Sequence, residues 1–235
     1  MNNDTSKVDL NKLLKKKLTA NDAIIIAVNL IPLLGVWLWN WDAKEMFLVY
    51  CLETVIVGLY TIIQLFLVTQ VRRRDVFNEE TGAVASGYFF IFFFILHYGF
   101  FLFIQMGIFL SVLKFPGLDG FTSVFKFLFN FPEYLSGDAL LVLLGFVVSY
   151  GATVAGKFIM SGKYKTARLG VVMFMPYPRI FVQQFVVILG TFVLMFGSEA
   201  SKIFMLIFVA VKVFFEIFLD FDRLIDETVK PSTQL

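Results

Sequence analysis

The sequence predicts an all-α integral membrane protein, a bundle of six transmembrane helices, on three observations. Of its 235 residues, 59% are hydrophobic and 16% are charged, whereas a soluble domain is about half apolar and about a quarter charged. The apolar residues form continuous runs, each near the roughly 20 residues that cross a hydrocarbon core, and they lack the two-residue alternation of barrel strands. Basic residues gather in alternate connections between the runs, as expected for the cytoplasmic side of a membrane protein.

The predicted membrane domain covers residues 22–221. Its six helices are expected at 22–39, 45–68, 88–113, 138–160, 179–196 and 201–221. A basic amphipathic tail at 1–21 precedes it and a second tail at 222–235 follows it. If the first tail is helical, its apolar residues occupy one face and lysines occupy the rest. The tail either lies on the inner membrane surface in this way or is a disordered basic segment.

The basic residues also predict the orientation. Fifteen of the 20 lysines and arginines fall in the two tails, in the connection that contains Arg72, and in or beside the connection that contains Lys163, which Lys157 and Arg179 flank. By the positive-inside rule these parts are cytoplasmic, so both termini are expected in the cytoplasm of a multi-pass protein of the cell (inner) membrane. Trp37, Trp39 and Trp41 then fall at the outer interface, where aromatic belts lie.

The connection after the third predicted helix is long and aromatic. Its middle, FTSVFKFLFNFPEYL at 121–135, is amphipathic and is bounded by Pro116 and Pro132. We expect a helix that lies in the outer interface or dips into it, where it either packs as part of the fold or serves a partner or lid role.

The last predicted helix carries a charged stripe, because Lys212, Glu216 and Asp220 are spaced four apart. A lysine near the bilayer centre costs roughly 2.5–3.5 kcal/mol on insertion scales, so it tends to face a protein interior or a water-filled cavity. An acid four residues after a lysine forms the weaker of the two helical pairings. We therefore expect partners from other helices, the alternative being a Lys212–Glu216 pair whose lysine reaches toward water.

Strongly polar residues at membrane depth supply candidate partners, and Asn29 and Gln183 are two of them. The predicted buried polar cluster consists of Glu53, His97, Gln105, Arg179, Gln184, Lys212, Glu216 and Asp220. A lone histidine at such a depth is more often a hydrogen-bonded packing residue than a ligand or a base. Neither a catalytic residue nor a metal site is predicted.

A stripe of small residues marks the fourth predicted helix. It consists of Gly145, Ser149, Ala152 and Gly156, spaced three to four apart. Such a face lets another helix approach closely, so its predicted role is helix packing, within the chain or with a neighbour.

Several of these polar positions resemble a prokaryotic family of multispan membrane proteins that is catalogued only as a domain of unknown function. The matching residues are Tyr50, Glu53 and Gly58; His97, Tyr98 and Gly99; Pro176, Tyr177, Arg179 and Ile180; and Lys212 with Glu216. Thr54 stands where the family tends to have Asn. Gln184 and Asp220 stand where some relatives have histidines that could bind a transition metal, and one histidine with carboxylates and an amide is a weaker zinc site. The resemblance thus implies positions but no cofactor and no activity.

Three classes of function remain open from the sequence. The first is a protein whose buried polar cluster binds or moves a small solute, an ion or a proton. The second is a membrane scaffold or interaction subunit whose polar residues only lock helix packing. An intramembrane enzyme fits less well, because Ser149 has no evident base and the last predicted helix has no histidine.

The expected partners follow from the composition. They are the lipid bilayer and either further copies of the chain or another membrane protein. A net charge of +2 gives no basic surface for nucleic acid, and the single Cys51 excludes an intrachain disulfide.

Overall fold

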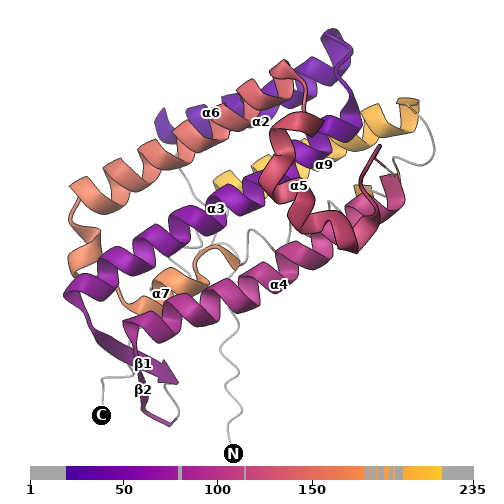
Figure 1. The fold of residues 1–235 in the computed structure, drawn as a ribbon. Helices are drawn as coiled ribbons and strands as arrows, with labels where there is room; N and C mark the ends of the chain where they lie inside the picture. The colour runs from indigo at the N-terminus through magenta and orange to yellow at the C-terminus, as the bar shows by residue number, and fades with distance from the viewer. Residues whose placement is uncertain are drawn as a thin grey trace, which may run out of the picture.

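The computed structural model describes residues 20–78, 81–113, 115–177 and 198–218 and, between the last two ranges, residues 181, 184, 188–190 and 193. This part of the chain is mostly helical, with five long helices that run side by side (Figure 1). They are α2 (Ala20–Leu38), α3 (Ala43–Val71), α4 (Gly87–Leu113), α6 (Gly137–Val154) and α9 (Ser198–Phe218). Apart from Ala20 and Asn21, both predicted tails lie outside the described residues.

Three of the helices are long and apolar enough to cross a membrane. They are Ala43–Val71, Gly87–Val112 and Gly137–Met160, the last formed by α6 and a π-helical turn, η3 (Ala155–Met160). Shorter apolar stretches lie in α2 at Ile26–Leu38 and in α9 at Met205–Phe214. The predicted span at 179–196 falls largely outside the described residues. These helices indicate a membrane protein.

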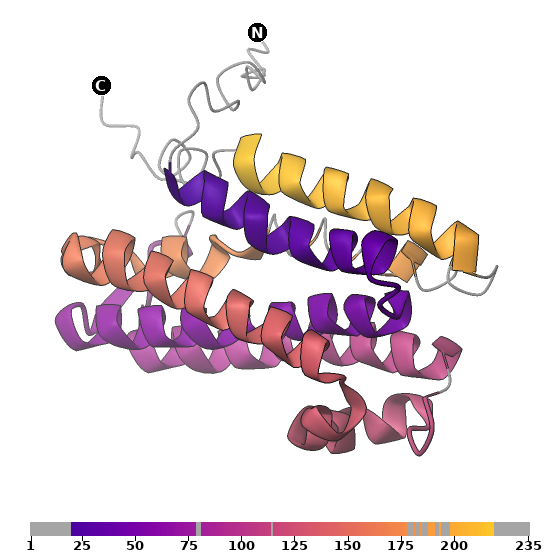
Figure 2. The same cartoon turned by 90° about the horizontal axis from the view of Figure 1, so that it is seen from above.

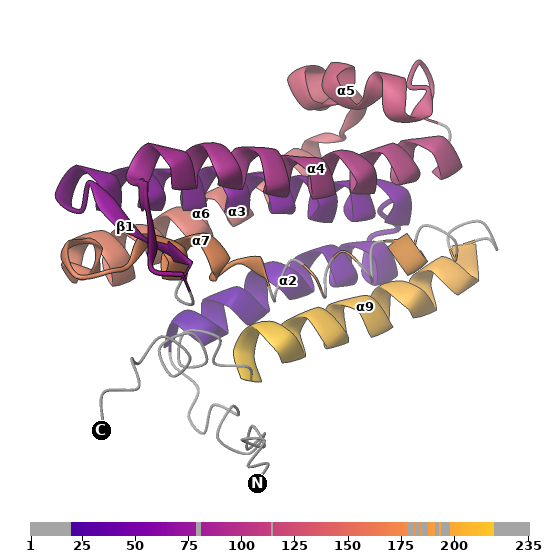
Figure 3. The same ribbon diagram turned by 90° about the horizontal axis from the view of Figure 1, so that it is seen from below.

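The long helices form two layers. Seen from above and from below, α2 and α9 lie together on one side and α3, α4 and α6 on the other (Figures 2 and 3). In the apolar window of α3, 72% of residues are buried, against 33% in α4 and 28% in α6. The sides of α4 and α6 that face away from α3 carry exposed apolar residues such as Phe92, Phe100 and Leu144. α3 is therefore the central helix. The outward sides of α4 and α6 are apolar, as expected for surfaces that contact lipid.

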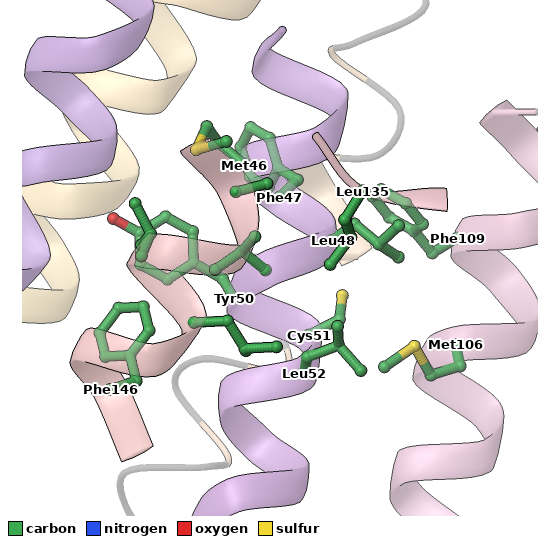
Figure 4. Packing of buried hydrophobic residues seen from close by; sticks show 14 of the residues in the cluster. Met46, Phe47, Leu48, Tyr50, Cys51, Leu52, Met106, Phe109, Leu135 and Phe146 are labelled. Atoms are coloured by element: carbon green, nitrogen blue, oxygen red, sulfur yellow. The ribbon is translucent and has the colours of Figure 1, made fainter. Parts of the chain in front are cut away.

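The main core gathers around the first half of α3. Tyr50 and Cys51 are fully buried between Met106 and Phe109 of α4 and Phe146 of α6 (Figure 4). A second core lies toward the other end of α3, where Leu65 packs with residues of α4 and of the short helix α7 (Leu169–Phe174).

Glycines allow the closest approaches between elements. A Cβ atom built at Gly58 of α3 would lie 2.5 Å from the Tyr98 ring of α4. One built at Gly151 of α6 would lie 2.6 Å from the Tyr60 hydroxyl of α3. Both distances are shorter than carbon contacts allow, so a side chain at either position would force its neighbour to move.

An antiparallel hairpin, which the sequence did not lead us to expect, connects α3 to α4. Its strands are β1 (Arg74–Asn78) and β2 (Ala83–Ser86). Buried Asp75 fixes its position, because its carboxylate accepts the Leu169 backbone N–H of α7 at 2.7 Å and the Val76 N–H at 2.9 Å. Arg72 and Arg168 lie 3.4 and 3.9 Å from the same carboxylate. The hairpin is therefore tied to the connection after α6.

The opposite end of the bundle carries the aromatic connection. It folds as η1 (Gly120–Ser123), α5 (Val124–Asn130) and η2 (Phe131–Tyr134), beside the end of α4 (Figure 3). Val124 and Phe127 enter the main core, whereas Phe125 and Phe129 are exposed. The predicted helix is present in this connection, and its amphipathic pattern divides the residues between core and surface.

Candidate buried polar site

A buried ion pair lies at the centre of the bundle. The Lys212 ammonium of α9 is 2.6 Å from Oε2 and 2.8 Å from Oε1 of Glu53, which comes from α3. The two side chains are 3% and 0% exposed. The same ammonium donates a hydrogen bond to Oδ1 of Asn29 on α2. Lys212 thus takes these partners from two other helices.

Two tyrosines hold the acceptors in place. The Tyr150 hydroxyl of α6 donates to Glu53 Oε1 at 2.6 Å, a short bond of the kind that a charged acceptor makes. The Tyr50 hydroxyl donates to the backbone carbonyl of Asn29 at 2.9 Å and so ties α3 to α2 beside the Asn29 side chain that accepts from Lys212. The site therefore joins four helices that are far apart in the sequence.

Two aromatic rings complete the surroundings of the ammonium. Lys212 Nζ lies 4.8 Å from the ring centre of Tyr50 and 5.0 Å from that of Phe146. These rings are neighbours in the main core, with centres 5.8 Å apart (Figure 4). A cation this close to an aromatic face is attracted by the negative face of the ring. We call Asn29, Tyr50, Glu53, Phe146 and Tyr150 the ammonium cage.

The cage offsets a large desolvation cost. Removing a lysine and a glutamate from water costs several kcal/mol for each ion, which only close pairing and further hydrogen bonds recover. The described contacts supply both to Lys212 and Glu53. The arrangement can hold a cation, and the Glu53 carboxylate can also accept a proton.

The structure brings together only part of the predicted cluster. Glu53 and Lys212 meet, and Asn29, which the sequence offered as a partner, joins them. Tyr50, Phe146 and Tyr150 were not included in the predicted cluster. Spacing is a sequence signal for all three, since Tyr50 precedes Glu53 by one helical turn and Phe146 and Tyr150 are one turn apart. Tyr50 also stands at one of the positions that resemble the family.

Gln105 and Gln184 make other contacts. Gln105 Nε2 lies 3.6 Å from Cys51 Sγ, and Gln184 Nε2 donates to the Phe101 carbonyl at 3.2 Å. The Oε1 atom of each glutamine is buried without a hydrogen-bond partner in the described part of the chain.

His97 lies on an exposed side of α4 and is not brought to the cage. Its Nδ1 atom is 2.8 Å from the Tyr177 hydroxyl, and its ring stacks on Phe93 with centres 5.5 Å apart. These contacts suit a hydrogen-bonded packing residue.

The structure does not describe the side chains of three residues of the predicted cluster. Arg179, Asp220 and the side chain of Glu216 lie outside the described residues. No group of three potential metal-ligating side chains occurs among the residues searched, which are the described ones.

The small-residue stripe of α6 is only partly covered. A Cβ atom at Gly145 would lie 3.8 Å from Val28 of α2, and one at Gly156 would meet nothing within 4 Å. Ser149 is half-buried and Ala152 is exposed. The close contact of α6 is instead at Gly151, which was not among the predicted positions.

Comparison with known proteins gives a family and no activity. A family model described as "Family of unknown function (DUF6498)" matches residues 12–232. The comparisons with curated proteins and with solved structures found no match. Function therefore has to be argued from the geometry of the buried site.

Proposed function

Since the chain belongs to this family of unknown function, DUF6498, which assigns it no activity, we propose from its geometry that it binds or moves a small solute, an ion or a proton within the membrane. The observation that carries this proposal is the buried Lys212–Glu53 pair in the ammonium cage. Ionisable residues inside membrane helices are costly and commonly mark ion, substrate or proton pathways.

A contribution to folding stability does not by itself explain why a buried ion pair is present. Replacing a buried ion pair by well-packed apolar residues is often neutral or stabilising, because the desolvation cost disappears. Phe146 and the main core also lie against Lys212, so part of its surroundings is apolar. A function at the pair accounts for charges that packing does not need.

The proposal includes the topology of six membrane helices with both termini cytoplasmic. The end of α6 leads to the hairpin end of the bundle, where Arg168 meets Asp75. α9 begins at the other end, where the Lys202 carbonyl accepts the Trp37 indole N–H at 3.2 Å. The two described segments that flank the predicted 179–196 thus lie at opposite ends of the bundle, which supports the proposal of a crossing there.

Thermal unfolding of the detergent-purified protein tests the proposed function. The midpoint would be measured against pH and against Na⁺, K⁺, Zn²⁺, phosphate, acetate and ethanolamine, for the wild type, Glu53→Gln and Lys212→Met. We expect at least one condition to raise the midpoint of the wild type and to have no effect on Glu53→Gln, because ligand binding stabilises only a protein that has the site. The response of Lys212→Met then shows whether the ligand also needs the lysine. If no condition acts on the wild type without acting equally on Glu53→Gln, the site is not a binding site.

The alternative is a scaffold in which the cage only locks helices together. The observation in its favour is that the cage residues satisfy one another across four helices. A scaffold predicts that the double variant Glu53→Gln/Lys212→Met recovers most of the stability lost in each single variant and that no condition in the panel acts on the wild type. Binding predicts that the condition-dependent shift stays absent in the double variant even where stability returns.

A further inference from the structure

The groups around Lys212 Nζ have the composition of a receptor for an ammonium ion. Glu53 contributes a carboxylate, Asn29 an amide oxygen, and Tyr50 and Phe146 two aromatic faces. We propose that the cage is a binding site for small primary ammonium ligands and that Lys212 is a tethered occupant which such a ligand displaces. This inference rests on the proposed function and names the ligand class of the same site.

The contacts favour a primary ammonium over other cations. Among its described contacts, Lys212 Nζ meets oxygen atoms of Asn29 and Glu53, and an –NH₃⁺ group has three N–H donors to offer such acceptors. A quaternary ammonium has none. Mg²⁺ and Ca²⁺ prefer six or more oxygen ligands, and the aromatic faces supply none. The cage therefore suits a ligand that both donates hydrogen bonds and tolerates aromatic contact.

The contacts also favour displacement of the lysine over displacement of the glutamate. The Glu53 carboxylate is held by the Tyr150 hydroxyl and is fully buried. Lysine has a long flexible stem that can carry its ammonium toward a membrane interface. A cationic ligand would replace the Lys212 ammonium by the same chemical group, whereas an anion would have to replace the buried Glu53 carboxylate and its bond from Tyr150.

Chemical rescue tests the cage directly. Lys212→Ala removes Cγ, Cδ, Cε and the ammonium, and n-propylammonium supplies the same atoms. We expect n-propylammonium to raise the unfolding midpoint of the detergent-purified Lys212→Ala protein saturably, by roughly 3–6 °C near saturation. Its neutral isostere n-propanol serves as the matched control and should have little effect. Rescue should be lost in Lys212→Ala/Glu53→Gln, and equal effects of the two compounds would overturn the proposal.

A binding measurement on the wild type keeps the proposal testable even where Lys212→Ala does not fold. Equilibrium dialysis with radiolabelled ethanolamine, with acetate as the control, measures whether a primary ammonium displaces Lys212. We expect saturable binding of ethanolamine and, in Phe146→Leu, affinity lower by about threefold because one aromatic face is lost. Absence of ethanolamine binding, or unchanged affinity in Phe146→Leu, overturns the proposal.

The two proposals fail differently. If a proton-, metal- or anion-dependent shift is lost in Glu53→Gln while ethanolamine does not bind, the proposed function stands and the ammonium class is wrong. If neither ethanolamine nor any condition in the panel acts on the wild type, both are wrong.

Discussion

The Tyr150 hydroxyl fixes the carboxylate that holds Lys212, and its removal is a test of a single hydrogen bond. Tyr150→Phe keeps the ring and loses the 2.6 Å bond to Glu53. We expect the free energy of unfolding to fall by about 1.5–3 kcal/mol, the usual value for a hydrogen bond to a charged group. Denaturant titration in detergent measures it.

Tyr60→Phe provides the matched control on the same pair of helices. The Tyr60 hydroxyl donates to the neutral carbonyl of Val147 at 2.9 Å. Its loss should cost about 0.5–1.5 kcal/mol, as for a neutral bond. Equal losses in the two variants would mean that Glu53 is not the charged acceptor that we describe.

The two charged residues of the buried site could be predicted from the sequence, and the aromatic residues of the cage could not. Glu53 and Lys212 stand out because each interrupts an apolar run, where a charge needs a partner. Phe146 is one of 31 phenylalanines, most of which offer no distinguishing context. Which ring faces the ammonium depends on the rotation of α6 about its axis, and tertiary packing sets that rotation.

The contact between α3 and α4 depends on the absence of a side chain at Gly58. The Tyr98 ring fills that space, and its hydroxyl donates to the Thr54 carbonyl, so the ring cannot easily withdraw. We expect Gly58→Ala to destabilise the protein by about 1–3 kcal/mol, as overpacking does. Thermal unfolding in detergent measures the change.

Gly99→Ala is the matched control for this contact. Gly99 also lies within a long helix, but a Cβ atom there would meet nothing within 4 Å. This substitution should be neutral or slightly stabilising, because alanine favours helix over glycine by about 1 kcal/mol. A comparable loss in both variants would contradict the role of Gly58 in helix packing.

Asp75 ties the hairpin to α7, so its substitution should loosen that end of the bundle. Asp75→Ala leaves the Leu169 and Val76 N–H groups without this acceptor and removes the charge between Arg72 and Arg168. We expect faster amide hydrogen exchange at residues 74–86 and 169–174, with little change in α3. Unchanged exchange in the hairpin would mean that β1 and β2 hold their position without this carboxylate.

The sequence predicted the long helices better than the short elements between them. The predicted helices at 45–68, 88–113 and 138–160 fall within α3, α4 and α6 with η3, with ends that differ by three residues at most, because continuous apolar runs give a strong signal. β1 contains five residues and β2 four, too few for a clear alternation. The hairpin also depends on Asp75 meeting α7, a contact between residues 94 positions apart.

The number and the lengths of the predicted helices do not show which helices are neighbours in the bundle. α9, the last described helix, packs beside α2, the first, and Trp37 and Lys202 join them at one end. This pairing of distant segments is what brings Lys212 to Asn29 and Glu53. The sequence supplied the charges, and the packing order of the helices determines which of them meet.

The proposed orientation assigns opposite ends of the bundle to opposite sides of the membrane. Arg72, Lys163 and Lys165 lie at the hairpin end, and α5 lies at the other end. By the positive-inside rule the proposal assigns the hairpin end to the cytoplasm. The proposed fifth crossing would then place Lys163 inside and Lys202 outside.

Cysteine labelling tests orientation and crossing number together. In a Cys51→Ser background, single cysteines would replace Thr81, Lys163, Phe129 and Lys202, and intact cells would be treated with a membrane-impermeant maleimide. We expect Phe129→Cys and Lys202→Cys to react in intact cells, and Thr81→Cys and Lys163→Cys only after permeabilisation. The opposite pattern would reverse the orientation. Lys163→Cys and Lys202→Cys reacting from the same side would exclude the fifth crossing, and with it the six-helix topology, while the buried site around Lys212 would still have to be explained.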